Sequence, residues 1–347
     1  MRRVPRIRLL LIRQSRFLLV GLIGLAAAVM LPGPVGAGDA TEREDDTMSG
    51  TESADYREFD QLWDYDDPAA TEAKFREALA AAETAEDTGA ALQIRTQIAR
   101  TLGLQKRYDD ATEVLDAVEP KLAAAPPVVR VRWLLERGRI LNTSGDRGGA
   151  RPVFEGAWEA ARACGEDGFA VDAAHMIAIV AESDEAMAWN ERALQLARTS
   201  DDPRAKKWRG SLLNNQGWTH HDQGRFEEAL ALFREALEAR REQGDEKLIG
   251  IARWCVARCQ RSLGRIEEAL AAQEQLLKEA EAANAKDGYV LEEIAECLLA
   301  LDRGEEARPY FARAHAVLSE DPWLPEGEPE RLARLAELGG VTAGAGE

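Results

Sequence analysis

Reactive side chains are scarce in this chain of 347 residues, which has four cysteines and four histidines. The sequence contains no Cys-x-x-Cys pair, no phosphate-binding glycine loop and no Gly-x-Ser-x-Gly nucleophile elbow. These absences argue against zinc, nucleotide and serine-hydrolase chemistry. We therefore expect a protein that is not an enzyme and that uses no metal and no cofactor.

The few candidates for chemistry are better explained by packing. Cys255 and Cys259 lie four residues apart on one expected helix, which is an uncommon place for a disulfide. We expect the cysteines to be buried small hydrophobic residues. His220, His221 and Asp222 are consecutive, so their side chains point about 100° apart on a helix and do not converge on one metal.

Positive charge is also scarce. The sequence has 44 basic and 62 acidic residues, a net charge of −18, and its first 37 residues hold six arginines and no acid. The rest of the chain therefore carries 38 basic and 62 acidic side chains, a net charge of −24. Nucleic acids and anionic membranes are recognised through basic surfaces, so this charge balance argues against both as partners.

The first 37 residues differ from everything after them. Six arginines precede an uncharged apolar run from Phe17 to Leu31, which is short for a membrane span, and small residues end the segment at Ala37. This order is typical of a secretory signal peptide cleaved after Ala37; an uncleaved amino-terminal anchor is the alternative. We expect residues 38–54 to form an acidic disordered linker and residues 341–347 a disordered tail, which leaves residues 55–340 as the folded domain.

One spacing rule recurs through the folded domain. A small residue is followed after twelve positions by alanine, after four more by a bulky residue and after three more by another small residue. Gly217, Ala229, Phe233 and Ala236 are the clearest copy. The intervals of four and three put three of these residues on one face of a helix that follows another helix. Such helix pairs bury their apolar faces only by stacking. The other copies start at Ala99, Gly138, Ala174, Ala257 and Ala295.

This pattern resembles the tetratricopeptide repeat, whose signature has small, small, aromatic and small residues at these positions. The resemblance implies an all-α, right-handed superhelical solenoid of antiparallel helix pairs. We expect about six repeats, a partial first repeat at Thr71 and a C-terminal capping helix over Glu330–Leu338. The signature alanines recur every 36–43 residues. The family period is about 34, so we expect helices longer by about one turn.

Two features depart from the family pattern. Pro152 and Pro309 fall in second helices, two residues after the signature alanine, and we expect both in the first turn, where a helix tolerates proline. In the degenerate copy, Asn190 replaces the aromatic residue. The turn near Ser183 also lacks the glycine that three other copies have, at Gly145, Gly224 and Gly264.

The same spacing predicts which side chains of the first helices face inward. These positions lie three residues before, one after and four after the first small residue, and we call them the inward stripe. In the first helix of each of the first five copies, the inward stripe is free of acids, and over these copies it holds four arginines. It also holds two tryptophans that we expect to be exposed. The predicted partner-binding residues are Arg100, Arg139, Asn142, His175, Asn214, Trp218, His221, Trp254, Arg258 and Arg261.

In tetratricopeptide folds the ligand lies along this inner face, so the resemblance implies a non-enzymatic scaffold that binds a protein or peptide. Tryptophan and arginine commonly dominate binding energy, and arginines bind carboxylates through two hydrogen bonds. The stripe therefore indicates an acidic or carboxylate-ended peptide. The alternatives are that these side chains only complete helix packing, that the chain is a peptide-sensing regulatory module, or that it is an enzyme.

A second resemblance bears on where the chain acts. The stretches FDQLWDYDDPAATEAKFREAL, AHMIAIV and DPWLPEGEPERLARL are similar to an uncharacterised group of bacterial tetratricopeptide repeat proteins, whose members start near the equivalent of Ser53. Translation from Met48 would give a cytoplasmic protein, whereas the leader predicts export, either periplasmic or secreted. We favour export, because the leader is too well formed to arise readily by chance.

Mass spectrometry of the native amino terminus distinguishes these two expectations. If the leader is cleaved after Ala37, the first peptide of the native protein starts at Gly38. A first peptide that starts at Met48 or Ser49 would contradict export through this leader.

Overall fold

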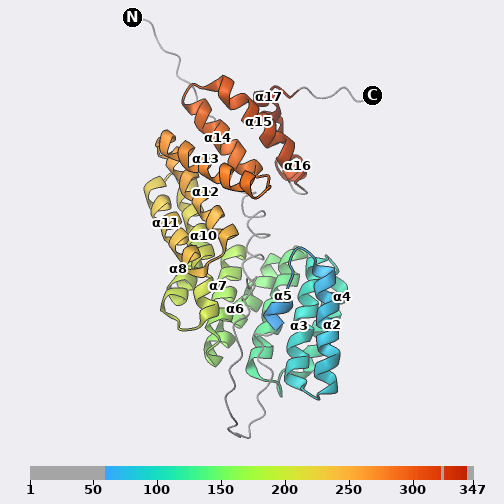
Figure 1. Ribbon diagram of the computed structural model, residues 1–347. Helices are drawn as coiled ribbons and strands as arrows, with labels where there is room; N and C mark the ends of the chain where they lie inside the picture. Colours follow the sequence, from blue (N-terminus) through green and yellow to red (C-terminus); the bar gives the residue numbers. More distant parts are fainter. Residues whose placement is uncertain (1–58, 322–323, 342–347) are drawn as a thin grey trace, which may run out of the picture. The chain divides into compact units, whose positions relative to one another are not determined.

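The computed structural model describes residues 59–321 and 324–341, and every regular element in this part of the chain is a helix (Figure 1). The predicted leader, acidic linker and tail lie outside the described residues. The chain divides into two compact units. Of the described residues, 59–216 and 235–245 form the N-terminal unit, and 217–234 and 246–341 form the C-terminal unit.

The N-terminal unit begins with the 3-10 helix η2 (Phe59–Leu62) and with α2 (Pro68–Thr84), the second helix of the partial first repeat. Three helix pairs follow: α3 (Thr88–Leu104) with α4 (Tyr108–Val118) and the 3-10 helix η3 (Glu119–Lys121), α5 (Pro127–Thr143) with α6 (Arg147–Cys164), and α7 (Asp167–Val180) with α8 (Ser183–Thr199). The spacing rule does not predict the short helix α9 (Pro203–Lys207), which lies within the longest interval between signature alanines.

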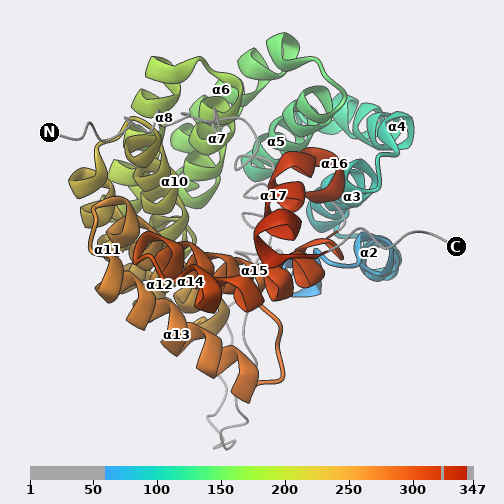
Figure 2. The same cartoon turned by 90° about the horizontal axis from the view of Figure 1, so that it is seen from above.

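The next pair, α10 (Arg209–Asp222) and α11 (Phe226–Gln243), contributes residues to both units. In the C-terminal unit, α12 (Glu246–Ser262) pairs with α13 (Ile266–Ala282), and α14 (Gly288–Ala300) pairs with α15 (Gly304–Leu318). After the short α16 (Leu324–Gly327), α17 (Pro329–Gly339) packs beside α15 as the predicted capping helix (Figure 2). Five of the second helices and three of the first helices have 17 or 18 residues, so the extra repeat length lies in both helices of a pair.

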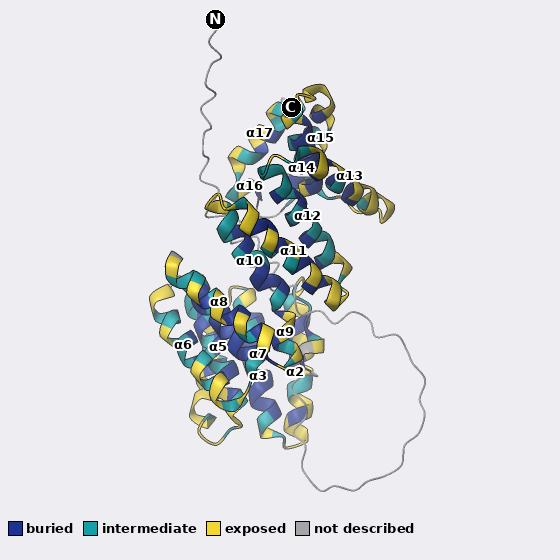
Figure 3. Cartoon of the chain, turned by 90° about the vertical axis from the view of Figure 1, so that its left-hand side faces the viewer, coloured by how far each residue is buried: buried dark blue, intermediate teal, exposed yellow. Residues whose placement is uncertain are grey.

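The signature residues form the core of each pair. The signature alanines of α4, α6, α11, α13 and α15 are at most 1 % exposed. Buried residues lie where the helices meet (Figure 3). Phe154 and Phe233 lie over glycines of the preceding helix: a Cβ atom on Gly138 would lie 2.4 Å from the ring of Phe154, and one on Gly217 would lie 2.5 Å from Phe233. The predicted all-α solenoid of helix pairs is therefore confirmed in both units.

The turn inside each pair explains the pattern of glycines. Gly145, Gly224 and Gly264 all have positive φ angles, in the region that favours glycine. Lys106 and Asp302 have positive φ at the equivalent places without being glycine. In the degenerate pair, Ala181 is extended, with φ −81° and ψ 165°, so its turn has a different conformation and does not need glycine.

The prediction that both helix prolines lie in the first turn is wrong. Helix α6 begins at Arg147, where Asp146 caps it by accepting a hydrogen bond from the Gly149 amide, so Pro152 is the sixth helical residue. Pro309 is likewise the sixth residue of α15. Each proline leaves one carbonyl without its helical donor, four residues earlier. Those carbonyls belong to exposed residues, Gly148 and Glu305, so water can hydrate them.

Replacing Gly217 with alanine tests this close packing. The new methyl group has no room beside the Phe233 ring, so we expect Gly217→Ala to lower the free energy of unfolding by about 1–3 kcal/mol in urea denaturation. Gly250→Ala is the matched control. Gly250 lies inside α12 with no atom within 4 Å of the added Cβ, so this change should stabilise the chain by about 1 kcal/mol. Equal effects of the two changes would contradict the packing argument.

Candidate functional site

Ion pairs join the first helices of successive repeats by a rule that the inward stripe did not include. An arginine that directly follows the small residue of one first helix contacts an acid on the next first helix. That acid lies two residues before the small residue of its own helix. Arg100 contacts Glu136 at 3.3 Å, and Arg258 contacts Glu293 at 2.9 Å. Arg139 contacts Asp172 in the same way, at 2.6 Å. The acids were missed because the stripe omits the position two before the small residue, where Glu136, Asp172 and Glu293 lie.

In the N-terminal unit these ion pairs balance one another. Arg139 donates to both oxygens of Asp172 and to Glu136, and Arg100 donates to Glu136 while its guanidinium lies over the ring of Trp63. Burial works to raise the pKa of Asp172, but the charges of Arg139 and Arg100 outweigh it and hold that pKa below its usual value. Two arginines thus face two acids, and the described contacts leave no net charge.

His175 continues this network on α7. It is 7 % exposed, and its ring lies 5.2 Å from that of Trp208. Burial lowers the pKa of His175, and the nearby charge of Arg139 acts in the same direction, against the carboxylate of Asp172 and a hydrogen bond with Asn190. His175 is therefore neutral at neutral pH.

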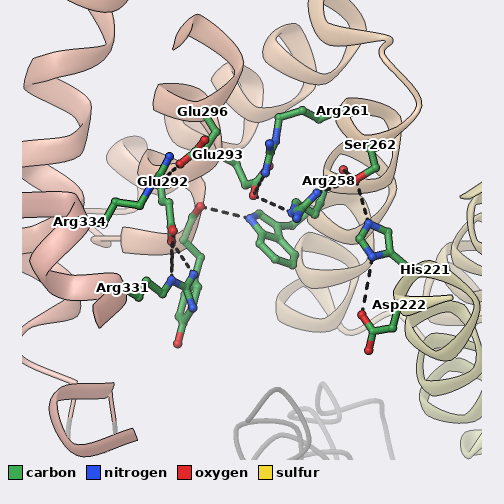
Figure 4. A network of polar contacts seen from close by, with 12 residues as sticks. His221, Asp222, Arg258, Arg261, Ser262, Glu292, Glu293, Glu296, Arg331 and Arg334 are labelled. Carbon is green, nitrogen blue, oxygen red and sulfur yellow. Dashed lines mark hydrogen bonds and ion pairs between the residues drawn. The ribbon is translucent and has the colours of Figure 1, made fainter. Parts of the chain in front are cut away.

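In the C-terminal unit the arginines and acids do not pair one to one (Figure 4). Arg258 and Arg261 both point at one carboxylate, Glu293, which is 5 % exposed. Arg258 Nε lies 2.9 Å from Oε1, and Arg261 Nε and Nη2 lie 2.8 and 3.0 Å from Oε2 and Oε1. Burial also opposes the charge of Arg261, but its contact with Glu293 raises its pKa. Burial lowers the pKa of Arg258, so this guanidinium is the less well compensated of the two.

Around Arg331 of α17 the acids outnumber the arginine. Arg331 donates to Glu292 on α14 and to Glu328, at 3.0 and 3.2 Å, so one arginine faces two acids there. Arg334 pairs with Glu296. Burial raises the pKa of Glu292, although its hydrogen bonds to Arg331 act to lower it. The ion pairs of this face thus join four arginines to four acids, with two arginines at Glu293 and two acids at Arg331.

Aromatic side chains lie beside these charges. Trp218 contacts Trp254, with ring centroids 6.0 Å apart, and Trp254 contacts Tyr289 at 6.3 Å and donates from its indole nitrogen to the Tyr289 carbonyl. The prediction of two exposed tryptophans is wrong: Trp218 is 8 % exposed, because it packs against Phe233 in the core, and Trp254 is partly buried. Tyr289, which the stripe did not include, is 37 % exposed.

His221 makes a contact that the sequence did not predict. Its Nε2 lies 2.9 Å from the hydroxyl of Ser262, and its Nδ1 lies 3.9 Å from Asp222. This resembles a catalytic triad only in its residue types. Asp222 is too far away to hydrogen-bond the imidazole, and the Ser262 hydroxyl accepts a hydrogen bond from Arg258 at 2.7 Å. The contact joins α10 to the last residue of α12.

The cysteines mostly occupy packing positions, as expected. All four are free; Cys255, Cys259 and Cys297 are buried, and Cys164 is partly buried. Burial raises the pKa of Cys255 and of Cys297 to about 12, and that of Cys259 to about 11. These thiols are poor nucleophiles. Within residues 59–321 and 324–341, no group of three or more His, Cys, Asp or Glu side chains is arranged to hold a metal ion.

The predicted site residues thus fall into two sets. The N-terminal unit holds Arg100, Arg139 and His175 in one network, together with Asn142 and Asn214, which are partly buried. The C-terminal unit brings the other five together on α10 and α12: Trp218, His221, Trp254, Arg258 and Arg261. Among the described helices, none is long and apolar enough to cross a membrane.

Comparison with known families agrees with the helix pairs and their register. Residues 174–242 and 208–282 match the tetratricopeptide repeat family. The chain therefore contains tetratricopeptide repeats over residues 174–282. A search of curated protein sequences found no match. The match begins at Ala174, inside the degenerate third repeat, so the family pattern extends over the position where Asn190 replaces the aromatic residue.

Solved structures share the fold at low sequence identity. RapI in its apo form is 15 % identical with a TM-score of 0.61, and the match covers 78 % of this chain and 75 % of RapI. BtubC from P. vanneervenii is 14 % identical with a TM-score of 0.52, over 61 % of this chain and 91 % of BtubC. The Pyrococcus horikoshii protein PH0952, a signal transduction ATPase with a tetratricopeptide repeat sensor, is 16 % identical with a TM-score of 0.58, over 79 % of this chain and 45 % of PH0952.

The neutral state of His175 predicts a loss of stability in mild acid. Its pKa is lowered by folding from an ordinary value of 6.5, so the unfolded chain takes up a proton more readily. The stabilisation is present above about pH 6.5 and is lost as the pH falls below it. We expect the melting temperature to fall between about pH 7.5 and about pH 5.5, and to fall less in His175→Gln.

His220→Gln provides a comparison for that measurement. Burial also lowers the pKa of His220, so its replacement should reduce the acid sensitivity too. His315→Gln is the control, since that side chain is not among the buried ones. An unchanged pH dependence in His175→Gln would show that this histidine is not held neutral by the fold.

Proposed function

We propose that this tetratricopeptide repeat protein is a non-enzymatic interaction module that binds a partner segment through a carboxylate, on the face that α12 and α14 share. The proposal rests on one observation: two guanidiniums, Arg258 and Arg261, share a single carboxylate beside the partly buried Trp254. Arginine pairs a carboxylate through two hydrogen bonds, and an adjacent aromatic ring adds apolar contact area. Protein or peptide partners also agree with the family match.

The charge balance favours the C-terminal unit over the N-terminal one as the binding site. Arg100 and Arg139 are matched by Glu136 and Asp172, so a ligand carboxylate would gain little there. The side chains of Arg258 and Arg261 are 19 % and 20 % exposed, close to the 18 % and 16 % of Arg100 and Arg139, so the two sites differ in how the arginines are paired and not in exposure. The acidic character of most of the chain would otherwise repel such a ligand, so the two arginines that meet at one carboxylate supply the selectivity.

Sensing is the second candidate function. PH0952, whose fold is similar, is described as having a tetratricopeptide repeat sensor. In that case a bound peptide would change the curvature of the helix stack, and the scattering radius of the chain would shift on peptide addition. A radius that stays constant at saturating peptide would favour the scaffold over the sensor.

We also propose that the protein acts outside the cytoplasm, on the strength of the arginine-led apolar segment before Ala37.

The binding site is tested with peptides selected on the full-length protein from a random hexapeptide library. Each selected peptide is then measured by calorimetry with a free C-terminal carboxylate and in its amidated form. We expect the free acids to bind more tightly. We expect Arg258→Ala and Trp254→Ala each to weaken them about thirtyfold, equivalent to ~2 kcal/mol.

Arg253→Ala is the matched control. Arg253 lies on the same helix, and its side chain is partly exposed like that of Arg258, but it pairs with Glu279 on α13. Its replacement should leave peptide affinity unchanged. Circular dichroism verifies that each variant keeps its helicity. Equal affinities of wild type, Arg258→Ala and Trp254→Ala would overturn the proposed site.

A further inference from the structure

We infer that Glu293 holds, in the free protein, the place that a partner carboxylate takes in the complex, so that α14 carries a built-in competitor for the ligand. This inference rests on the proposed function. It adds to that function a residue of the protein that sets the affinity and the selectivity of the site.

The contacts of Glu293 resemble those that a ligand carboxylate would make. Both of its oxygens are engaged: Oε1 accepts from Arg261 and forms an ion pair with Arg258 at 2.9 Å, and Oε2 accepts from Arg261. Fork-like, charge-assisted pairs of this kind are the strongest hydrogen bonds that a guanidinium makes. A partner carboxylate can enter only by sharing these donors with Glu293 or by displacing it.

Displacement of Glu293 is easier than that of its counterparts in the N-terminal unit. There Arg139 takes both oxygens of Asp172 and also donates to Glu136, so two acids already occupy this guanidinium. Two arginines compete for Glu293, so each can keep a carboxylate partner if a second carboxylate arrives. The exchange replaces one buried ion pair with another, which avoids leaving a guanidinium uncompensated.

The neighbouring acids cannot take this role, because they have other partners. Glu292 is held by Arg331, and Glu296 is held by Arg334, both from α17 (Figure 4). Their negative charges also lie near Arg258 and contribute to its electrostatic environment. Glu293 is therefore the acid whose own contacts coincide with the proposed ligand site.

The position of Glu293 also connects binding to the packing of two repeats. Arg258 and Arg261 are on α12, whereas Glu293 is on α14, so this ion pair joins the first helices of consecutive helix pairs. A ligand that takes over the arginines removes that link. Binding would then loosen α14 from α12 within the C-terminal unit, and the stiffness of this contact would limit the affinity.

Glu293→Gln tests the inference. The amide keeps the shape of the side chain and removes its charge, so the two arginines lose their competitor. Without ligand we expect a lower melting temperature, because two largely buried guanidiniums lack a counter-charge. Free-carboxylate hexapeptides are selected separately on wild type and on Glu293→Gln. We expect them to bind the variant about tenfold more tightly than wild type, and to raise the melting temperature of the variant more than that of wild type.

Glu296→Gln is the control, since it removes a neighbouring charge that Arg334 holds rather than the shared carboxylate. It should change the affinity less than about twofold. If Glu293→Gln binds no more tightly than wild type while Arg258→Ala still weakens binding, the competitor role is overturned and the binding site stands. If neither protein prefers free acids to amidated peptides, both the site and the competitor are overturned.

Discussion

The close approach of two helices through small residues is the constraint on which this structure depends. Where Phe154 and Phe233 lie directly over glycine backbones, the distance and rotation between the two helices have little freedom. That fixed rotation determines which positions of a first helix face the next repeat. The ion pairs between first helices, and with them the distribution of charge on the inner face, follow from this packing.

The fold could be predicted from the sequence because its signal is repeated. Six copies of one spacing rule identify the helix pairs, and a departure such as Asn190 weakens only one copy. The errors concern features that repetition does not specify. Helix α6 starts upstream of the expected point because Asp146 caps it, and α9 is an insertion that belongs to no repeat.

The candidate site was harder to predict, because it depends on contacts between helices. The stripe named Arg100, Arg139, Arg258 and Arg261 as equivalent, and the structure distinguishes them by their acids. Glu136, Asp172 and Glu293 lie at one shared position two residues before the small residue. Comparison of each first helix with the next one in the sequence would have identified these three acids. Which arginines share one carboxylate depends on side-chain geometry, and the residue spacing does not specify that geometry.

The last helix gives the C-terminal unit a particular kind of boundary. A stack of repeats that stopped on an apolar helix face would offer a surface for further stacking, much as an exposed edge strand offers one to another sheet. Helix α17 buries Leu332 and Leu335 against the unit, whereas Ala333 and Glu337 are exposed. Its outer surface has few groups that a further repeat could pack against. The same helix that supplies Arg331 and Arg334 to the inner face therefore also ends the growth of the solenoid in that direction.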